Sequence, residues 1–142
     1  MSDTEKKSIT KKKRISVQSA KGKGRRLQQW VAKRLSEITG IPSGKDCLIQ
    51  SREMGQSGTD VKLIGEALDK VKLSIECKYQ ESWSVHSWID QAKANQLPDT
   101  DWILFAKRNH NKPVVIIDAE VFFKMFEERY NDKHKKRLTR RQ

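Results

Sequence analysis

SGTDVKLIGEALDKVKLSIECKYQE, residues 57–81, is the stretch that decides the fold of this chain. A Gly-Thr turn leads into Asp60, and a later strand-like run ends in Glu76, Cys77 and Lys78. Successive side chains of a strand point to opposite faces, so Glu76 and Lys78 share one face. A hairpin between the two strands would bring Asp60 close to both. Two carboxylates and one ammonium at one point suit a metal ion that activates water beside a phosphate.

Hydrophobic periodicity predicts the elements on both sides of this stretch. Gly40 and Pro42 mark the end of the first helix. We expect helices at 25–39, 84–96 and 118–130, strands at 47–51, 60–64, 71–78, 102–106 and 114–117, and a turn or bulging loop at 65–70. The predicted fold class is α/β, a central mixed five-stranded sheet flanked by helices in the order α-βββ-α-ββ-α.

The third strand alternates apolar and polar residues, which predicts one buried face and one polar face. The apolar set is Val71, Leu73, Ile75 and Cys77, and the polar set is Lys72, Ser74, Glu76 and Lys78. Three tryptophans lie on apolar stripes and are expected in the core: Trp30, Trp88 and Trp102. Trp83, at a strand-to-helix junction, is placed to stack on a base or to wedge a junction open.

The chain has 142 residues and a net charge of +12, which fits one domain with cationic ends. Residues 1–26 carry +8, residues 129–142 carry +6, and the body between them carries −2. We expect a flexible basic arm at 1–20, a domain at 21–130 and a basic tail at 131–142. Such ends indicate nucleic acid as the partner. Solvated, disordered ends are the alternative, and an anionic membrane surface fits less well.

The sequence contains no apolar run of membrane-spanning length and no secretory signal, which predicts a cytoplasmic protein. Cys47 and Cys77 form no CxxC pair and are expected to be reduced core residues. His86, His110 and His134 share no metal-ligand spacing.

The order of GTDVKL, SIECKYQE and the QAKAN helix resembles the PD-(D/E)xK nuclease superfamily, and most closely the small archaeal-type and phage Holliday-junction resolvases. The resemblance covers about residues 21–126 and implies a restriction-endonuclease-like core. It also implies that a homodimer hydrolyses DNA phosphodiesters with Mg²⁺ or Mn²⁺, in the cytoplasm or, if phage-encoded, in the host cytoplasm.

By matching positions, Asp60 stands for the first half of the family motif, and Glu76 and Lys78 for the second. Two departures are visible. Thr59 replaces the usual Pro, and Gln28 stands where the resolvases carry a Glu in the first helix. Gln28 can bind a metal through its carbonyl oxygen but adds no charge. Glu37 and Glu53 are other possible donors.

Asp60 and Glu76 are hard oxygen donors for Mg²⁺ or Mn²⁺, with the Cys77 backbone carbonyl as a further ligand. Lys78 would orient the attacking water or stabilise charge on the phosphate, and Gln91 would help to orient Lys78 or the phosphate. The alternative is structural: Asp60 caps a turn and Glu76 pairs with Lys78. Basic residues expected to contact DNA are Lys23, Arg25, Arg26, Arg52, Lys107 and Arg108.

These features favour a metal-dependent, structure-specific DNA endonuclease, foremost a Holliday-junction resolvase, with no small-molecule substrate. A nicking, flap or restriction-type nuclease is the alternative within this class. Outside it, a non-catalytic nucleic-acid-binding module or an RNA-protein assembly factor would use the basic ends alone. Only the nuclease needs Asp60, Glu76 and Lys78 together.

Overall fold

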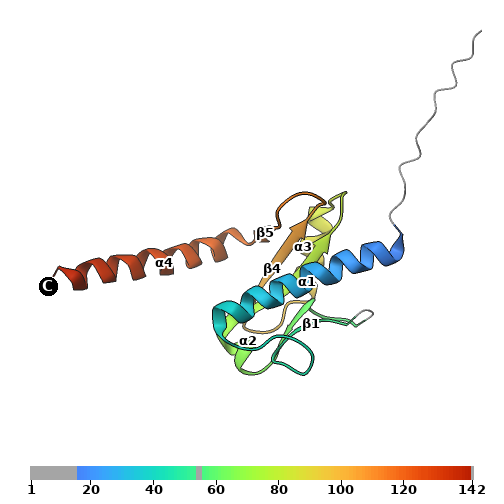
Figure 1. Ribbon diagram of the computed structural model, residues 1–142. Helices are drawn as coiled ribbons and strands as arrows, with labels where there is room; N and C mark the ends of the chain where they lie inside the picture. The colour runs from blue at the N-terminus through green and yellow to red at the C-terminus, as the bar shows by residue number, and fades with distance from the viewer. Residues whose placement is uncertain (1–15, 54–55, 142) are drawn as a thin grey trace, which may run out of the picture.

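The computed structural model describes residues 16–53 and 56–141 (Figure 1). The elements in this part of the chain are α1 (Val17–Thr39), β1 (Ile49–Ser51), β2 (Val61–Leu63), α2 (Glu66–Val71), β3 (Leu73–Tyr79), α3 (Val85–Ala94), β4 (Asp101–Lys107), β5 (Val114–Ile117) and α4 (Ala119–Arg140). None of the described helices is long and apolar enough to cross a membrane.

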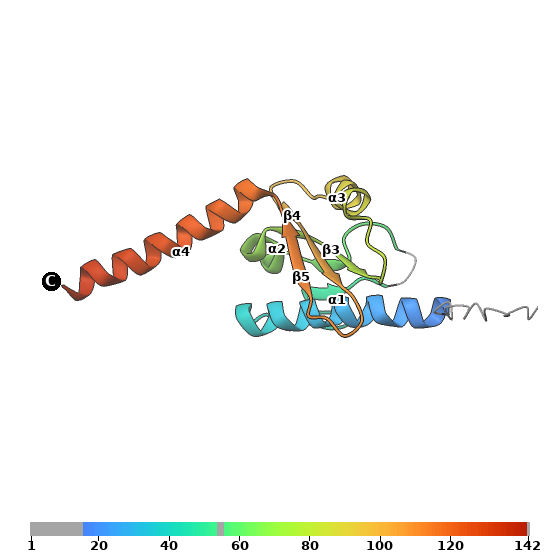
Figure 2. The ribbon, with the colours of Figure 1, turned by 90° about the horizontal axis from the view of Figure 1, so that it is seen from above.

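The strands form one sheet in the order β1-β2-β3-β4-β5. Only β3 and β4 are parallel, because α3 crosses over between them. The predicted five-stranded mixed sheet flanked by helices is confirmed. Figure 2 shows α1 and α3 on opposite sides of the sheet. The α1 side packs Leu27, Val31 and Ala32 on the sheet, whereas the α3 side packs Trp88 and Ala92.

The prediction of a turn or bulging loop at 65–70 is wrong, because this segment forms the short helix α2. Its sequence EALDKV contains good helix formers, and a left-handed Lys72 (φ 53°) ends it. Val71 therefore closes a helix instead of opening a strand, and β3 begins at Leu73.

Both terminal helices are longer than their apolar periodicity predicts. α1 begins at Val17, where the Ser16 hydroxyl accepts a hydrogen bond from the Ser19 N–H at 3.2 Å. Residues 17–20 of the expected arm are thus helical, and residues 1–15 lie outside the described residues. α4 begins after Asp118, whose carboxylate accepts a hydrogen bond from the Glu120 N–H at 2.9 Å, and continues to Arg140. Cations in its last turn complement the helix dipole.

The polar face expected on β3 is largely buried, because α3 covers it. Ser74 and Glu76 are each only 2 % exposed. Trp88 and Trp102 are buried as predicted, but Trp30 is 45 % exposed and does not belong to the core. Cys77 is buried, whereas Cys47 is partly exposed.

Candidate active site

Asp60 lies where β2 and β3 separate. Its backbone N–H donates to the Ile75 carbonyl at 2.8 Å, and its Oδ2 accepts the Cys77 N–H at 2.8 Å. The carboxylate therefore takes the place of the next main-chain acceptor of the β2–β3 ladder, which ends at Val61. This bond holds Asp60, which is 3 % exposed, against β3.

Glu76 lies beside Asp60 on the face of β3 that α3 covers. Its pKa is raised from 4.5 to about 7, mainly by burial, then by the Asp60 charge and a hydrogen bond with Asp60. Asn95 and Lys78 oppose the shift, and the Asn95 amide donates to Glu76 Oε2 at 3.4 Å. Two neighbouring carboxylates with little water disfavour a second negative charge. Near neutral pH, burial and the Asp60 charge therefore favour the protonated form of Glu76 far more than in a free side chain.

The oxygen donors at this point fit a divalent cation. Backbone groups of a strand alternate between its two edges, so the Cys77 carbonyl lies on the same edge as the Ile75 carbonyl that accepts from Asp60. A cation bound there would relieve the carboxylate repulsion that raises the pKa of Glu76. Carboxylate and carbonyl oxygens suit Mg²⁺ and Mn²⁺. The described residues contain no group of three His, Cys, Asp or Glu side chains able to hold a metal ion, so the acidic donors number two.

Lys78 and Gln91 meet as the sequence predicts. The Lys78 ammonium donates to Gln91 Oε1 at 2.7 Å, which ties the end of β3 to α3. Lys78 is half-buried and shares the face of Glu76. The amide oxygen adds no charge, so it orients the ammonium without neutralising it.

Arg52 does not lie free to grip DNA. The hairpin pairs Ser51 with Val61, which brings Arg52 next to Asp60. Its guanidinium is 2.7 Å from Asp60 Oδ1 and donates to the Gly58 carbonyl at 2.9 Å. Arg52 therefore supplies the cation that balances the buried Asp60 carboxylate.

The first helix does not bring its expected donor into contact with the carboxylates. Gln28 is half-buried, and the structure records no hydrogen bond from it to Asp60 or Glu76 among the described residues. α1 packs on the sheet face opposite to Glu76. The alternative donor Glu37 pairs with Arg34 at 3.0 Å on the surface.

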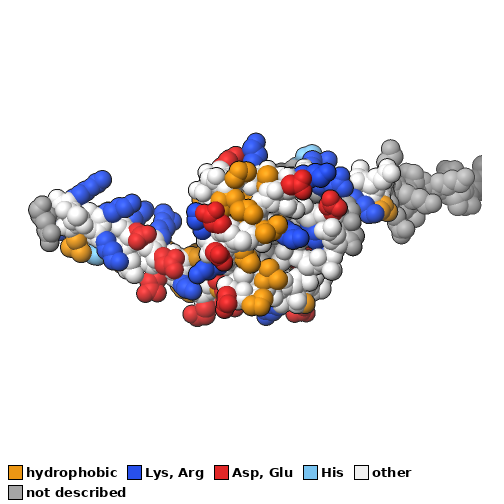
Figure 3. Space-filling model, turned by 90° about the horizontal axis from the view of Figure 1, so that it is seen from below, with side chains coloured by type: hydrophobic (Ala, Val, Ile, Leu, Met, Phe, Trp, Pro, Cys, Tyr) orange, Lys and Arg blue, Asp and Glu red, His pale blue; other side chains and the backbone are white. Residues whose placement is uncertain are grey.

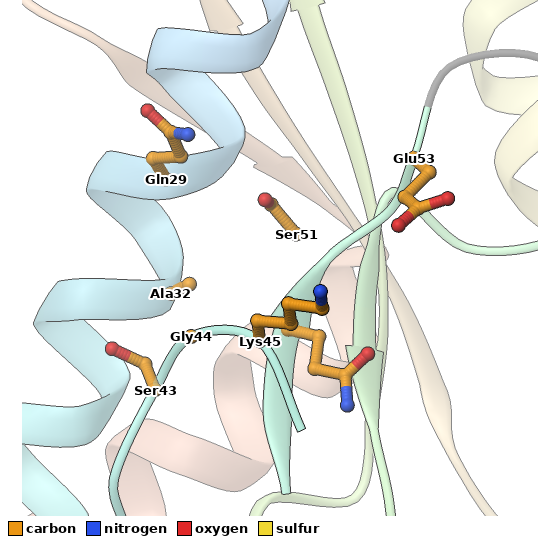
Figure 4. A pocket seen from close by; sticks show the side chains of 8 residues that line it. Gln29, Ala32, Ser43, Gly44, Lys45, Ser51 and Glu53 are labelled. Atoms are coloured by element: carbon orange, nitrogen blue, oxygen red, sulfur yellow. The ribbon is translucent and has the colours of Figure 1, made fainter. Parts of the chain in front are cut away.

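Glu53 faces a pocket of about 340 Å³ on the α1 side. Figure 4 shows Glu53 and Gln29 on either side of this pocket, with Ser51 between them. Glu53 also lines a second pocket together with Arg52, Arg25 and Gln29.

The remaining residues expected to bind DNA lie around the end of β3. Trp83 is 37 % exposed, donates its indole N–H to the Gln80 carbonyl at 2.8 Å and packs on Trp88. Arg108 lies 4.0 Å from Glu81. Lys23 and Lys107 place their ammonium groups over the Tyr79 ring, and Arg25 and Arg26 are exposed on α1.

Asn95 is the site residue that sequence reasoning missed. It lies four residues after Gln91, so helical spacing alone places both on one face of the QAKAN segment.

Comparisons with known proteins found no match, whether to a family model, a curated protein or a solved structure.

Proposed function

We propose that the protein is a divalent-metal-dependent DNA endonuclease for branched substrates, foremost a Holliday-junction resolvase that acts as a homodimer in the cytoplasm. One observation carries this proposal. Asp60 and Glu76 form a buried carboxylate pair where β2 and β3 separate, and Lys78 lies on the same face, held by Gln91. The pKa of Glu76, raised to about 7 mainly by burial, supports the proposal, because perturbed pKa values cluster at functional sites.

Asp60, Glu76 and the Cys77 carbonyl would hold Mg²⁺ or Mn²⁺. When bound, such a cation lowers the pKa of water and offsets the charge of the phosphate. Glu76 must first release its proton, so the site favours cation binding as the pH rises through about 7. Lys78 would donate to the attacked phosphate or the incoming water, and Gln91 would hold its ammonium in that position.

The proposed homodimer rests on α4, which has no buried residues and projects from the sheet (Figures 1 and 2). Phe122, Phe126 and Tyr130 follow one another along it, with ring centroids 6.3 and 6.5 Å apart. These rings are each about half exposed, and contiguous exposed apolar side chains are typical of an interaction site. Figure 3 shows Lys and Arg side chains along the projecting helix, which would remain free to meet DNA.

The test incubates the full chain with four-way junction, flap and linear duplex DNA in Mg²⁺. Wild type should cut the junction best, and Asp60→Ala and Lys78→Ala should cut it at least about a hundredfold more slowly. Lys62→Ala is the matched control, since this exposed lysine also lies two residues after an acidic residue. Sedimentation of the same proteins reports the dimer. The proposal would be refuted if wild type cut none of these substrates, or if the two variants cut the junction as fast as wild type.

A second candidate is a nucleic-acid-binding module that does not cut. The Arg52–Asp60 ion pair favours it, because Arg52 already occupies the oxygen that a metal ion would need. This module would bind branched DNA equally well with and without Mg²⁺ and leave it intact.

A further inference from the structure

An aromatic cleft of about 330 Å³ lies on the α1 side of the sheet, behind the candidate active site. Its lining residues come from α1, from the ends of β3 and β4, and from the residue before β5: Arg26, Leu27, Trp30, Tyr79, Lys107 and Pro113. Tyr79 directly follows Lys78. The two side chains therefore point to opposite faces of the same strand end.

The cleft combines a rigid apolar surface with an accessible indole. Leu27 is only 3 % exposed and belongs to the core, whereas Trp30 leaves 45 % of its surface in solvent. Two ammonium groups lie over the Tyr79 ring, Lys23 at 5.6 Å and Lys107 at 5.0 Å from its centroid. Lys107 is itself held by the Asn111 carbonyl at 2.6 Å.

The charge around the cleft is positive. Lys23, Arg25 and Arg26 on α1 make no ion pair with any acidic residue in the described chain. Cations near a surface without acidic partners are available for phosphates. Exposed aromatic rings combined with such cations bind single-stranded nucleic acid, where every base offers a ring face.

We propose that this cleft holds one unpaired nucleobase of the DNA strand that is cut, stacked on the indole of Trp30, with Lys23 and Arg26 on its phosphates. This proposal rests on the proposed endonuclease function and defines its substrate class. A base inside a continuous duplex is enclosed by its neighbours and cannot enter, whereas a branch point interrupts the continuous stack, so that a base there can leave its pair at lower cost. A strand that crosses the end of β3 would reach the cleft on one face and Lys78 on the other.

The test measures DNA binding by the full chain in EDTA, so that it does not depend on cleavage. The probes are a labelled oligothymidine strand and a duplex of the same length, and the readouts are fluorescence anisotropy and tryptophan quenching. Trp30→Ala should bind the single strand about tenfold more weakly than wild type. Its binding to the duplex should stay within about twofold.

Trp30→Phe keeps an aromatic ring and should retain most of the affinity, but it should lose the part of the quenching that stacking on Trp30 causes. Ile38→Ala is the matched control, since Ile38 lies on the same helix and is 74 % exposed. It should bind both probes as wild type does. Equal single-strand binding by Trp30→Ala and wild type, or equal losses on both probes, would overturn the proposal. If wild type fails to cut DNA in Mg²⁺, the proposed nuclease function is refuted, whereas the result for single-strand binding at Trp30 still holds.

Discussion

The two faces of the sheet at the end of β3 differ in almost every physical respect. On the α3 face, Glu76 is buried and bonded to neighbouring side chains, and burial raises its pKa to about 7. On the α1 face, Tyr79 and Trp30 line an open cleft surrounded by cations. Burial shifts the pKa of a group and fixes its position, whereas exposure leaves rings and charges free to bind. We therefore place chemistry on the covered face and recognition on the open one.

Glu76→Gln should have the largest effect on cleavage, because it removes the carboxylic acid from the sheet face that α3 covers and leaves the α1 face unchanged. Cleavage in Mg²⁺ should fall at least about a hundredfold. Single-strand binding in EDTA should be unchanged, since the cleft lies on the other face. Weaker single-strand binding by this variant would contradict the separation of the two faces.

The same variant should also change the pH dependence of stability without metal. Between about pH 4.5 and 7 the folded state keeps a proton on Glu76 that the unfolded state has released, so the stability of wild type falls as the pH rises. The loss is about 3 kcal/mol, and a neutral Gln escapes it. Urea unfolding in EDTA should show the variant more stable at pH 8 and close to wild type at pH 4. An equal pH dependence of both proteins would contradict the assignment.

Arg52→Gln should have a smaller effect, on stability and metal binding, and this effect should also be confined to the sheet face that α3 covers. Without metal, the buried Asp60 carboxylate loses its charged partner, so the free energy of unfolding should fall by about 2 kcal/mol. Mn²⁺ should raise the melting temperature of this variant more than that of wild type, because Asp60 Oδ1 is released. The matched control is Arg34→Gln, which breaks only an exposed pair and should cost less than about 1 kcal/mol. Equal Mn²⁺ shifts in variant and wild type would show that Arg52 does not compete with a metal ion.

The smallest expected effect is on the salt dependence of DNA binding, and it comes from removing cations beside the cleft on the α1 face. Lys23→Ala combined with Arg26→Ala should reduce the salt dependence of single-strand binding, lowering the slope of log affinity against log salt by about 1.4. Lys70→Ala should leave the slope unchanged, because Lys70 pairs with Glu66 at 2.7 Å. Binding titrations over a salt series give the slope, and an unaltered slope in the double variant would remove these cations from the DNA interface.

Local sequence patterns predicted most elements because periodicity reports which side of an element is buried. These patterns failed where an element is short or where its tertiary contacts determine its structure. α2 has six residues, too few for a visible helical period, although its helix formers were a usable signal. α1 extends back to Val17 through residues that carry no apolar stripe and include the poor helix formers Gly22 and Gly24. Trp30 lies at the margin of the stripe, and only the position of the sheet shows that it is exposed.

The candidate site could be predicted in part. Asp60, Glu76 and Lys78 were found because strand alternation places two of them on one face and a hairpin supplies the third. The Lys78–Gln91 hydrogen bond was anticipated as well, although their roles in catalysis stay predictions. The contact of Arg52 with Asp60 could not be predicted, because it depends on the register of the β1–β2 hairpin, and DNA binding by Arg52 stays a prediction.

The sequence by itself determined the five strands and the three longer helices in their order, the acidic pair with its lysine and the cationic ends, because these follow from residue type and spacing. Only the tertiary structure decided that α3 buries Glu76, that Arg52 balances Asp60, and that Trp30 and Tyr79 share a cleft. Each of these depends on segments far apart in the chain, whose contacts are set by packing against the sheet. Local patterns carry no information about such packing.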